Sequence, residues 1–266
     1  MIEEFWALGR RAFANTPDPA FVYRSPSFAE GFARLVYDAT ELRGGLSLIT
    51  GEIGCGKTML AQSLGDGLVD SPCDVIMLAY PKVTPAQMLA AVARGIGIEA
   101  PPRGKLDLIV AIRDRLKEQH AAGRRPVLVV DEAQLATPSL LEEIRLLTNF
   151  EDRQEKHLHV VLLGQPELRE RVRKRPQIDQ RVSLRFHVEP MAADDVRAYV
   201  LHRLRVAGRA RDDIFTPAAM TVLAERSGGV PRRVNTLATQ GLFVGAMQRL
   251  TEINEQLMTD VADDQE

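Results

Sequence analysis

The chain has 266 residues, of which 45% are hydrophobic and 26% are charged, and its formal net charge is −2. These values fit one large or two modest globular domains with a real core, and the charge gives no general signal for nucleic-acid binding. The two cysteines, Cys55 and Cys73, make neither a disulfide framework nor a metal motif and suit a reducing compartment. No segment approaches the ~18 uninterrupted apolar residues of a membrane helix, and the amino terminus is acidic where a signal peptide is basic. We therefore expect a cytoplasmic protein without a transmembrane segment.

Residues 5–23 mix aromatic side chains with turn-forming residues and have neither a helical nor a strand period. The aromatic side chains need somewhere to pack, so the segment is predicted to lie across the core as an ordered arm. A helix is predicted from Ser25-Pro26 to about Leu42, and Gly44-Gly45 ends it. Residues 1–43 are therefore assigned to an arm and a helix that pack on the core.

Residues 46–50 predict a short buried strand, and residues 59–64 have helical spacing. Between them the sequence GEIGCGKT, residues 51–58, has the pattern G-x-x-x-x-G-K-T in the strand–loop–helix context that a phosphate-binding loop requires. Its glycines allow backbone angles that turn successive N–H groups toward phosphate oxygens, and the helix adds its positive amino-terminal end. The alternative is a glycine-rich turn with a chance Lys-Thr, which the agreement of motif and flanking elements disfavours.

ATP and Mg²⁺ are the cofactors that this loop predicts. Lys57 is expected to bridge the β- and γ-phosphates, and the Thr58 hydroxyl is expected to hold Mg²⁺. Cys55 is interpreted as a small residue at a variable position of the motif rather than as a redox-sensitive thiol. The predicted nucleotide-binding residues are Gly51, Glu52, Ile53, Gly54, Cys55, Gly56, Lys57, Thr58 and Met59.

Further strands and helices alternate after the loop. Residues 74–79 form a second apolar run, and helices are predicted at about 84–98 and 106–121. Strands that alternate with helices of this length indicate right-handed crossovers and a mostly parallel sheet. The predicted fold class is therefore α/β.

Residues 126–130 predict a buried strand that ends in two adjacent carboxylates, Asp131 and Glu132. The carboxyl end of such a strand is where ligands bind in open α/β sheets. Asp131 is expected to hold the Mg²⁺ hydration shell, and Glu132 to polarise the attacking water as a general base. Acidic residues also end strands simply to reach solvent, but a phosphate loop upstream disfavours that alternative.

A helix is predicted from Thr137-Pro138 to about Thr148, and residues 159–164 predict another central strand, followed by Gln165. The Gln165 amide is placed where it could touch the γ-phosphate or the attacking water. The alternative, in which it caps the turn before Pro166, stays open.

Seven basic residues lie between positions 169 and 185, and a solvated helix face explains most of such a run. A phosphate loop elsewhere in the chain singles out one of them, because an arginine presented to a neighbouring subunit's γ-phosphate is a recurrent catalytic device. Beyond a boundary at Glu189-Pro190 the sequence predicts helices at about 193–207, 217–227 and 231–249. The predicted domains are an ATPase core at 44–190, a helical lid at 191–250 and an acidic, fraying tail at 251–266.

With these motifs in place, the sequence resembles AAA+ ATPases, and more narrowly their ExeA/GspA-like branch. That branch is found with general secretion, pilus and exopolysaccharide-export systems. The resemblance extends from about residue 5 to 250 and rests on residues 16–23 (TPDPAFVY), 51–58, 130–134 (VDEAQ), 145–151 (RLLTNFE), 164–168 (GQPEL) and 228–235 (GGVPRRVN).

The resemblance implies a P-loop AAA+ core with a carboxyl-terminal helical lid. It implies sensor 1 at Gln165, sensor 2 at Arg232, and a trans arginine finger at Arg181, with Arg175 and Arg185 as rivals. It also implies a Mg²⁺-dependent ATPase that assembles with itself into a ring or filament and acts as a motor or switch.

Three functions stay open at this point. Some secretion-type relatives continue into a membrane helix and a cell-wall-binding domain that this sequence lacks, so an envelope role is expected to act through an inner-membrane secretion or polysaccharide-export partner. In that case the protein would be peripheral at the inner membrane. A related branch regulates transposition on DNA, although the net charge does not indicate DNA binding, and a nucleotide-gated scaffold is the third hypothesis.

Overall fold

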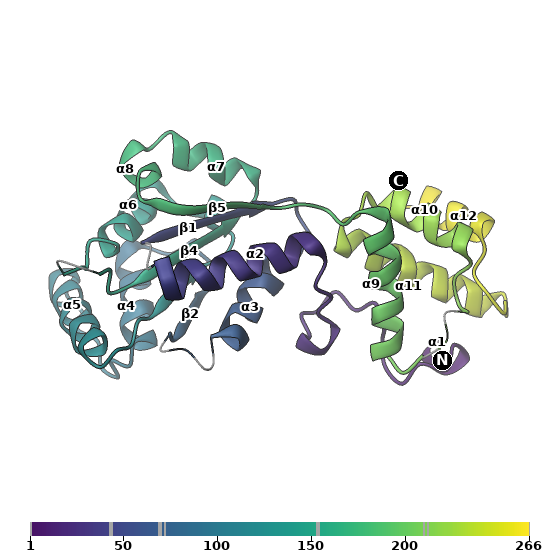
Figure 1. Cartoon of the computed structure of the whole chain (residues 1–266), viewed down its shortest axis with the longest axis horizontal. Helices are drawn as coiled ribbons and strands as arrows, with labels where there is room; N and C mark the ends of the chain where they lie inside the picture. Colours follow the sequence, from purple (N-terminus) through teal and green to yellow (C-terminus); the bar gives the residue numbers. More distant parts are fainter. Residues whose placement is uncertain are drawn as a thin grey trace. The chain divides into compact units, whose positions relative to one another are not determined.

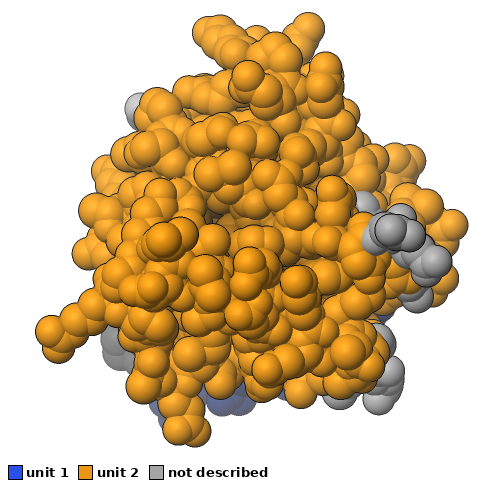
Figure 2. Space-filling model, turned by 90° about the vertical axis from the view of Figure 1, so that its left-hand side faces the viewer, with its two compact units in different colours: residues 1–29, 52–59, 189–266 blue, residues 30–51, 60–188 orange. Residues whose placement is uncertain are grey.

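The computed structural model describes residues 2–42, 45–68, 71, 73–152, 155–209, 211 and 213–265. The chain divides into two compact units, which Figure 2 colours separately. The sheet unit comprises Glu30–Gly51 and Leu60–Val188. The helical unit comprises Met1–Ala29, Glu52–Met59 and Glu189–Glu266. Gly44, where the first long helix was predicted to end, lies outside the described residues.

Among the described residues, five strands form one sheet in the order β2-β3-β4-β1-β5 (Figure 1). All neighbouring strands are parallel, which confirms the predicted parallel sheet. The three inner strands are buried along their whole length, as a sheet covered on both faces requires. The strands are β1 (Leu46–Gly51), β2 (Val75–Leu78), β3 (Val127–Val130), β4 (His159–Gly164) and β5 (Val182–Val188).

Helices cover the two faces of the sheet. One face packs against α4 to α8 through a shared cluster of buried apolar side chains. On the other face, α2 lies close to β5, because a Cβ on Gly31 would meet the Phe186 ring at 2.7 Å. Figure 1 shows α2 running along this part of the sheet. The helices are α2 (Pro26–Tyr37), α3 (Lys57–Gly67), α4 (Pro85–Gly95), α5 (Lys105–Ala121), α6 (Pro138–Leu147), α7 (Pro166–Arg173) and α8 (Pro176–Asp179).

Thr-Pro pairs start three of the helices. Thr84, Thr137 and Thr216 each accept a hydrogen bond from a backbone N–H in the first turn, and a proline follows each of them. The threonine satisfies an otherwise unpaired donor, and the proline supplies the helical φ without losing a needed N–H. The sequence therefore fixes where α4, α6 and α10 (Pro217–Ser227) begin.

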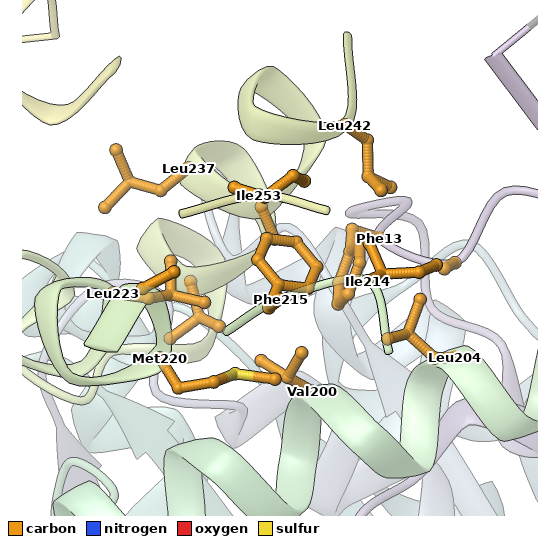
Figure 3. Close-up of a cluster of buried hydrophobic side chains, with 14 of the residues drawn as sticks. Phe13, Val200, Leu204, Ile214, Phe215, Met220, Leu223, Leu237, Leu242 and Ile253 are labelled. Carbon is orange, nitrogen blue, oxygen red and sulfur yellow. The ribbon is translucent and has the colours of Figure 1, made fainter. Parts of the chain in front are cut away.

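The helical unit has its own core, in which side chains from α9 (Ala193–Val206), α10 and α11 (Pro231–Met247) meet (Figure 3). The amino-terminal arm, which includes α1 (Ile2–Phe5), belongs to this core. Phe13 packs edge-on against Phe215 with ring centroids 6.3 Å apart, and Trp6 Nε1 donates to Leu242 O at 2.8 Å.

The arm was predicted to pack on the nucleotide-binding core, and that prediction is wrong for its buried aromatic side chains. Buried Arg203 of α9 explains why the arm stays with the helices. Its guanidinium donates to Ala12 O at 2.6 Å and to Ala14 O at 2.9 Å, so the arm's backbone carbonyls are satisfied there.

The acidic tail, predicted as a weak helix that frays, contains an ordered helix, α12 (Glu255–Asp263). Asn254 caps it by accepting from Leu257 N at 3.0 Å. Its apolar residues Leu257, Met258, Val261 and Ala262 are buried in the core of the helical unit, while its acidic residues face outward. The net acidity of the segment hid an amphipathic period of 3.6 residues.

Candidate functional site

The loop between β1 and α3 has the backbone that the glycine pattern predicts. Gly54 and Gly56 have φ of +88° and +94°, which glycine adopts without strain. Cys55 N donates to Glu52 O at 3.3 Å and closes the turn. Lys57 is the first residue of α3, and its Nζ donates back to Glu52 O at 2.8 Å. The loop therefore combines a buried cation with the amino terminus of a helix. Both features favour the binding of an anion.

The loop packs against the start of α11 within the helical unit. Arg232 N donates to Gly54 O at 3.4 Å, and a Cβ on Gly54 would lie 2.7 Å from Arg232 Cβ and 3.1 Å from Val230 Cγ1. A Cβ on Gly56 would meet no atom of the described chain within 4 Å. Gly54 is therefore required for close approach as well as for its φ, whereas Gly56 borders open space.

Cys55 is buried in this loop, and burial raises the pKa of its thiol, although neighbouring Lys57 acts in the opposite direction. The sign of the shift favours the protonated thiol at neutral pH, which is the less reactive form. The interpretation of Cys55 as a small structural residue agrees with this environment.

The two carboxylates predicted at the end of β3 have different surroundings. Asp131 is buried, and its Oδ1 accepts from Glu132 N at 2.8 Å. Glu132 has φ +50° and ψ 34°, a left-handed conformation that is costly for a non-glycine residue, by about 1–3 kcal/mol. The short helix η3 (Ala133–Leu135) follows immediately. Strained residues of this kind persist where the surroundings hold them, and they cluster at functional sites.

Gln134 holds the strained Glu132 side chain, although the sequence predicts no separate role for Gln134. Its Nε2 donates to Glu132 Oε2 at 2.6 Å, while its Oε1 accepts from Gln165 N at 3.2 Å. Arg171 donates to Gln134 O and, at 2.5 Å, to Ala136 O, which fixes the turn from the other side. The sequence signal was its place at the end of the VDEAQ motif, two residues after the carboxylate. Gln134 thus links the predicted base directly to the backbone of Gln165.

The sheet brings the ends of β1, β3 and β4 to one edge. Thr50 of β1 pairs with Gly164 of β4, and Val130 of β3 pairs with Leu162 of β4. Parallel strands in this register place Gly51, the two carboxylates and Gln165 at adjacent carboxyl ends, where open α/β sheets bind ligands.

Gln165 precedes α7 as its N-cap residue, yet its side chain makes no capping hydrogen bond in the described part of the chain. The alternative that the amide serves as a cap therefore has no support from the local geometry.

The three candidate finger arginines all bond within the sheet unit. Half-buried Arg181 donates from Nη1 to Thr148 Oγ1 at 3.2 Å. Arg175 donates to Arg171 O at 2.8 Å, and Arg185 donates to Asp179 O at 2.7 Å. Arg181 is the one whose partner is a neutral side chain. A neutral side-chain bond is weaker than one to a carboxylate, which Arg185 also makes with Asp179 Oδ1 at 2.9 Å.

Comparison with known proteins defines the class. Residues 41–172 match the family model described as an AAA domain. Similar solved structures include Cdc6p from Pyrobaculum aerophilum, with TM-score 0.73 and 16% identity over 91% of this chain and 67% of that one. The Aeropyrum pernix ORC2 protein in its ADPNP–ADP complexes has TM-score 0.70 and 16% identity over 97% and 72% of the two chains. The Thermotoga maritima RuvB Holliday junction branch migration motor has TM-score 0.61 and 15% identity over 92% and 72%. This chain has the fold of the AAA+ P-loop ATPases, as predicted.

The sequence relationship is narrower. General secretion pathway protein A of Aeromonas hydrophila is 38% identical over 246 residues, which cover 91% of this chain and 44% of that protein. The chain thus carries an AAA domain and is similar to this secretion protein, of whose length it spans less than half. No helix in the described part of the chain combines the length and the apolar character that a membrane crossing needs.

Proposed function

We propose that this protein binds ATP with Mg²⁺ and hydrolyses it, and that it acts as an oligomeric motor or switch. Lys57 and the N–H groups of the loop hold the β- and γ-phosphates. Gly51 to Met59 form the binding segment. Arg232 donates to the nucleotide from the start of α11, and its backbone contact with Gly54 supports that assignment.

The residues that would hold Mg²⁺ are Thr58 and Asp131. A hydroxyl at the start of α3 and a buried carboxylate are the hard oxygen donors that Mg²⁺ prefers, so the donor set fits the ion. When bound, Mg²⁺ would neutralise charge that develops on the phosphate oxygens.

Glu132 carries the proposal as the general base for the attacking water. Its left-handed backbone is maintained by the Asp131 and Gln134 contacts at the carboxyl end of β3. A carboxylate that merely reached for solvent would need neither the strain nor the partners. Gln165, tied through its backbone to Gln134, is proposed to touch the γ-phosphate or the water.

The Glu132→Gln variant is the direct test. The amide keeps the size of the side chain but cannot accept a proton, so hydrolysis should fall by ~10²-fold or more. ATP affinity should be retained. Steady-state phosphate release and nucleotide titration measure the two quantities, with exposed Glu167→Gln of α7 as the matched control. Turnover within a factor of about two of the parent would show that another group activates the water.

Gln134 is proposed as a positioning residue that acts through Glu132. In Gln134→Leu the carboxylate loses its amide partner, so kcat should fall ~10-fold or more while KM for ATP stays unchanged. In Gln134→Glu the amide donor is replaced by a second carboxylate that repels the charge of Glu132, so kcat should fall in this variant as well. Exposed Gln177→Leu serves as the control. A Gln134→Leu variant that changes only thermal stability would reduce Gln134 to a structural role.

The secretion relationship supports a role for the ATPase in a secretion, pilus or exopolysaccharide-export assembly. We propose an inner-membrane component of such an assembly as the partner and a peripheral location reached through it. Co-purification from detergent-solubilised membranes tests this role. An ATPase rate that changes when DNA is added, without membrane recovery, would favour the transposition-regulator alternative instead.

A further inference from the structure

Three potential metal ligands lie together in the sheet unit, away from Glu132 and Gln165. His120 is in the last turn of α5, and Asp152 and His157 lie in the connection between α6 and β4. His157 comes just before the first residue of β4. The cluster is therefore at the amino-terminal edge of the parallel sheet, opposite the carboxyl ends that carry Glu132 and Gln165.

The distances within the cluster approach those around a tetrahedral metal ion. Asp152 Oδ2 lies 3.2 Å from His120 Nε2 and 3.5 Å from His157 Nε2. Ligand atoms bound to zinc at about 2.0–2.2 Å in a tetrahedron are separated by about 3.4 Å. All three ligand atoms lie within 4.8 Å of one another. Two of the three edges thus already have the length that a tetrahedral site requires.

His157 is only 3% exposed, and neither of its ring nitrogens has a hydrogen-bond partner among the described residues. Such a buried polar group is costly unless something binds it. The His120 ring stacks on the His157 ring at 4.5 Å between centroids, and Nε2 of each ring lies within 3.5 Å of Asp152 Oδ2.

Asp152 is held in position by its own turn. Its Oδ1 accepts from Glu155 N at 2.9 Å, and its backbone N donates to Glu155 O at 3.1 Å. The antiparallel bridge between Glu151 and Lys156 closes the same turn. One carboxylate oxygen thus orders the loop while the other is directed at the two histidines.

We propose that His120, Asp152 and His157 bind a divalent transition-metal ion, with zinc preferred. Two imidazoles and one carboxylate are a zinc donor set, whereas Mg²⁺ and Ca²⁺ favour oxygen ligands. Three protein ligands leave a fourth position for water. The ion would tie the end of α5 to the start of β4, and it would act on the stability of the sheet unit without entering ATP hydrolysis.

The test uses the full chain without nucleotide, because nucleotides chelate metal ions. After incubation with Zn²⁺ and dialysis, elemental analysis should find about one zinc ion per chain, and the thermal midpoint should rise by a few degrees. Co²⁺ should give the visible absorption of a tetrahedral site without an intense thiolate band, which excludes Cys55 and Cys73 as ligands. Excess Mg²⁺ should not displace the ion.

His120→Asn is the principal variant because His120 is partly exposed and its replacement spares the core. Its zinc affinity should fall at least as far as the ~10–100-fold that losing an outer-shell group costs. The more buried His157→Leu should abolish uptake while removing an unpartnered polar group from the core. His202→Asn, a histidine of the helical unit, is the control and should bind zinc like the parent. Parent-like zinc retention by His120→Asn, or no uptake by the parent, would leave His120 and Asp152 as an ordinary ion pair and overturn the proposal.

Discussion

Replacing Lys57 by alanine is expected to abolish nucleotide binding. Lys57 is the only side-chain cation in the loop, it is buried, and its ammonium group already lies against Glu52 O at 2.8 Å. Two charge-assisted hydrogen bonds to the β- and γ-phosphates would each contribute about 1.5–3 kcal/mol. Their loss corresponds to a decrease in affinity of roughly 10²–10⁴-fold.

Calorimetric titration of ATP into the two proteins measures this loss, with exposed Lys82→Ala as the matched control. The variant must also retain its far-ultraviolet circular dichroism, because the same change removes the bond to Glu52 O. Unchanged ATP affinity in a folded Lys57→Ala protein would contradict the assignment of the loop.

Replacing Arg181 by alanine is expected to preserve nucleotide affinity and to lower the rate of ATP hydrolysis ~10³–10⁵-fold. In the transition state, negative charge on the γ-phosphate needs more positive charge than Lys57 and Mg²⁺ provide. We expect an arginine from a neighbouring subunit to provide the missing positive charge. Arg181 precedes the edge strand β5, which holds it in place, and it is bonded to a neutral hydroxyl that it can exchange for a phosphate. Arg175→Ala and Arg185→Ala are the comparison variants.

Mixing provides the sharper version of this experiment. Glu132→Gln and Arg181→Ala proteins, each inactive alone, should regain activity together, because some mixed interfaces contain an intact base and an intact finger. Specific activity that is independent of protein concentration, combined with a monomer by light scattering in ATP, would show that assembly is not required.

Much of the sheet unit and of the loop at residues 52–59 could be predicted because their signals are local. Four consecutive apolar residues make β3, a Thr-Pro pair starts α6, and the glycine pattern sets the angles of Gly54 and Gly56. Each of these depends on residues within one or two turns of chain. The register of a parallel sheet then brings Gly51, the two carboxylates and Gln165 to adjacent carboxyl ends without further information.

The parts that could not be predicted depend on contacts between distant segments. The sequence shows that Trp6 and Phe13 need burial, but the carbonyl that accepts the Trp6 indole N–H belongs to Leu242, 236 positions away. Gln134 was missed for a related reason. The Gln134 side chain forms one hydrogen bond with Glu132 and one with Gln165. Only the bond with Gln165 reaches outside the turn that contains Gln134.

The discontinuous make-up of the helical unit has a consequence for synthesis on the ribosome. Its arm emerges first, while α9 to α12, which bury that arm, emerge last. The residues of the sheet unit lie between them and can fold as soon as Val188 has left the exit tunnel, since domains generally fold as units during translation. Until α9 to α12 have also emerged, the arm's aromatic side chains lack the apolar core that buries them. The contact between Gly54 and Arg232 also cannot form before α11 has been synthesised. The loop at residues 52–59 therefore acquires its full set of contacts only late in translation.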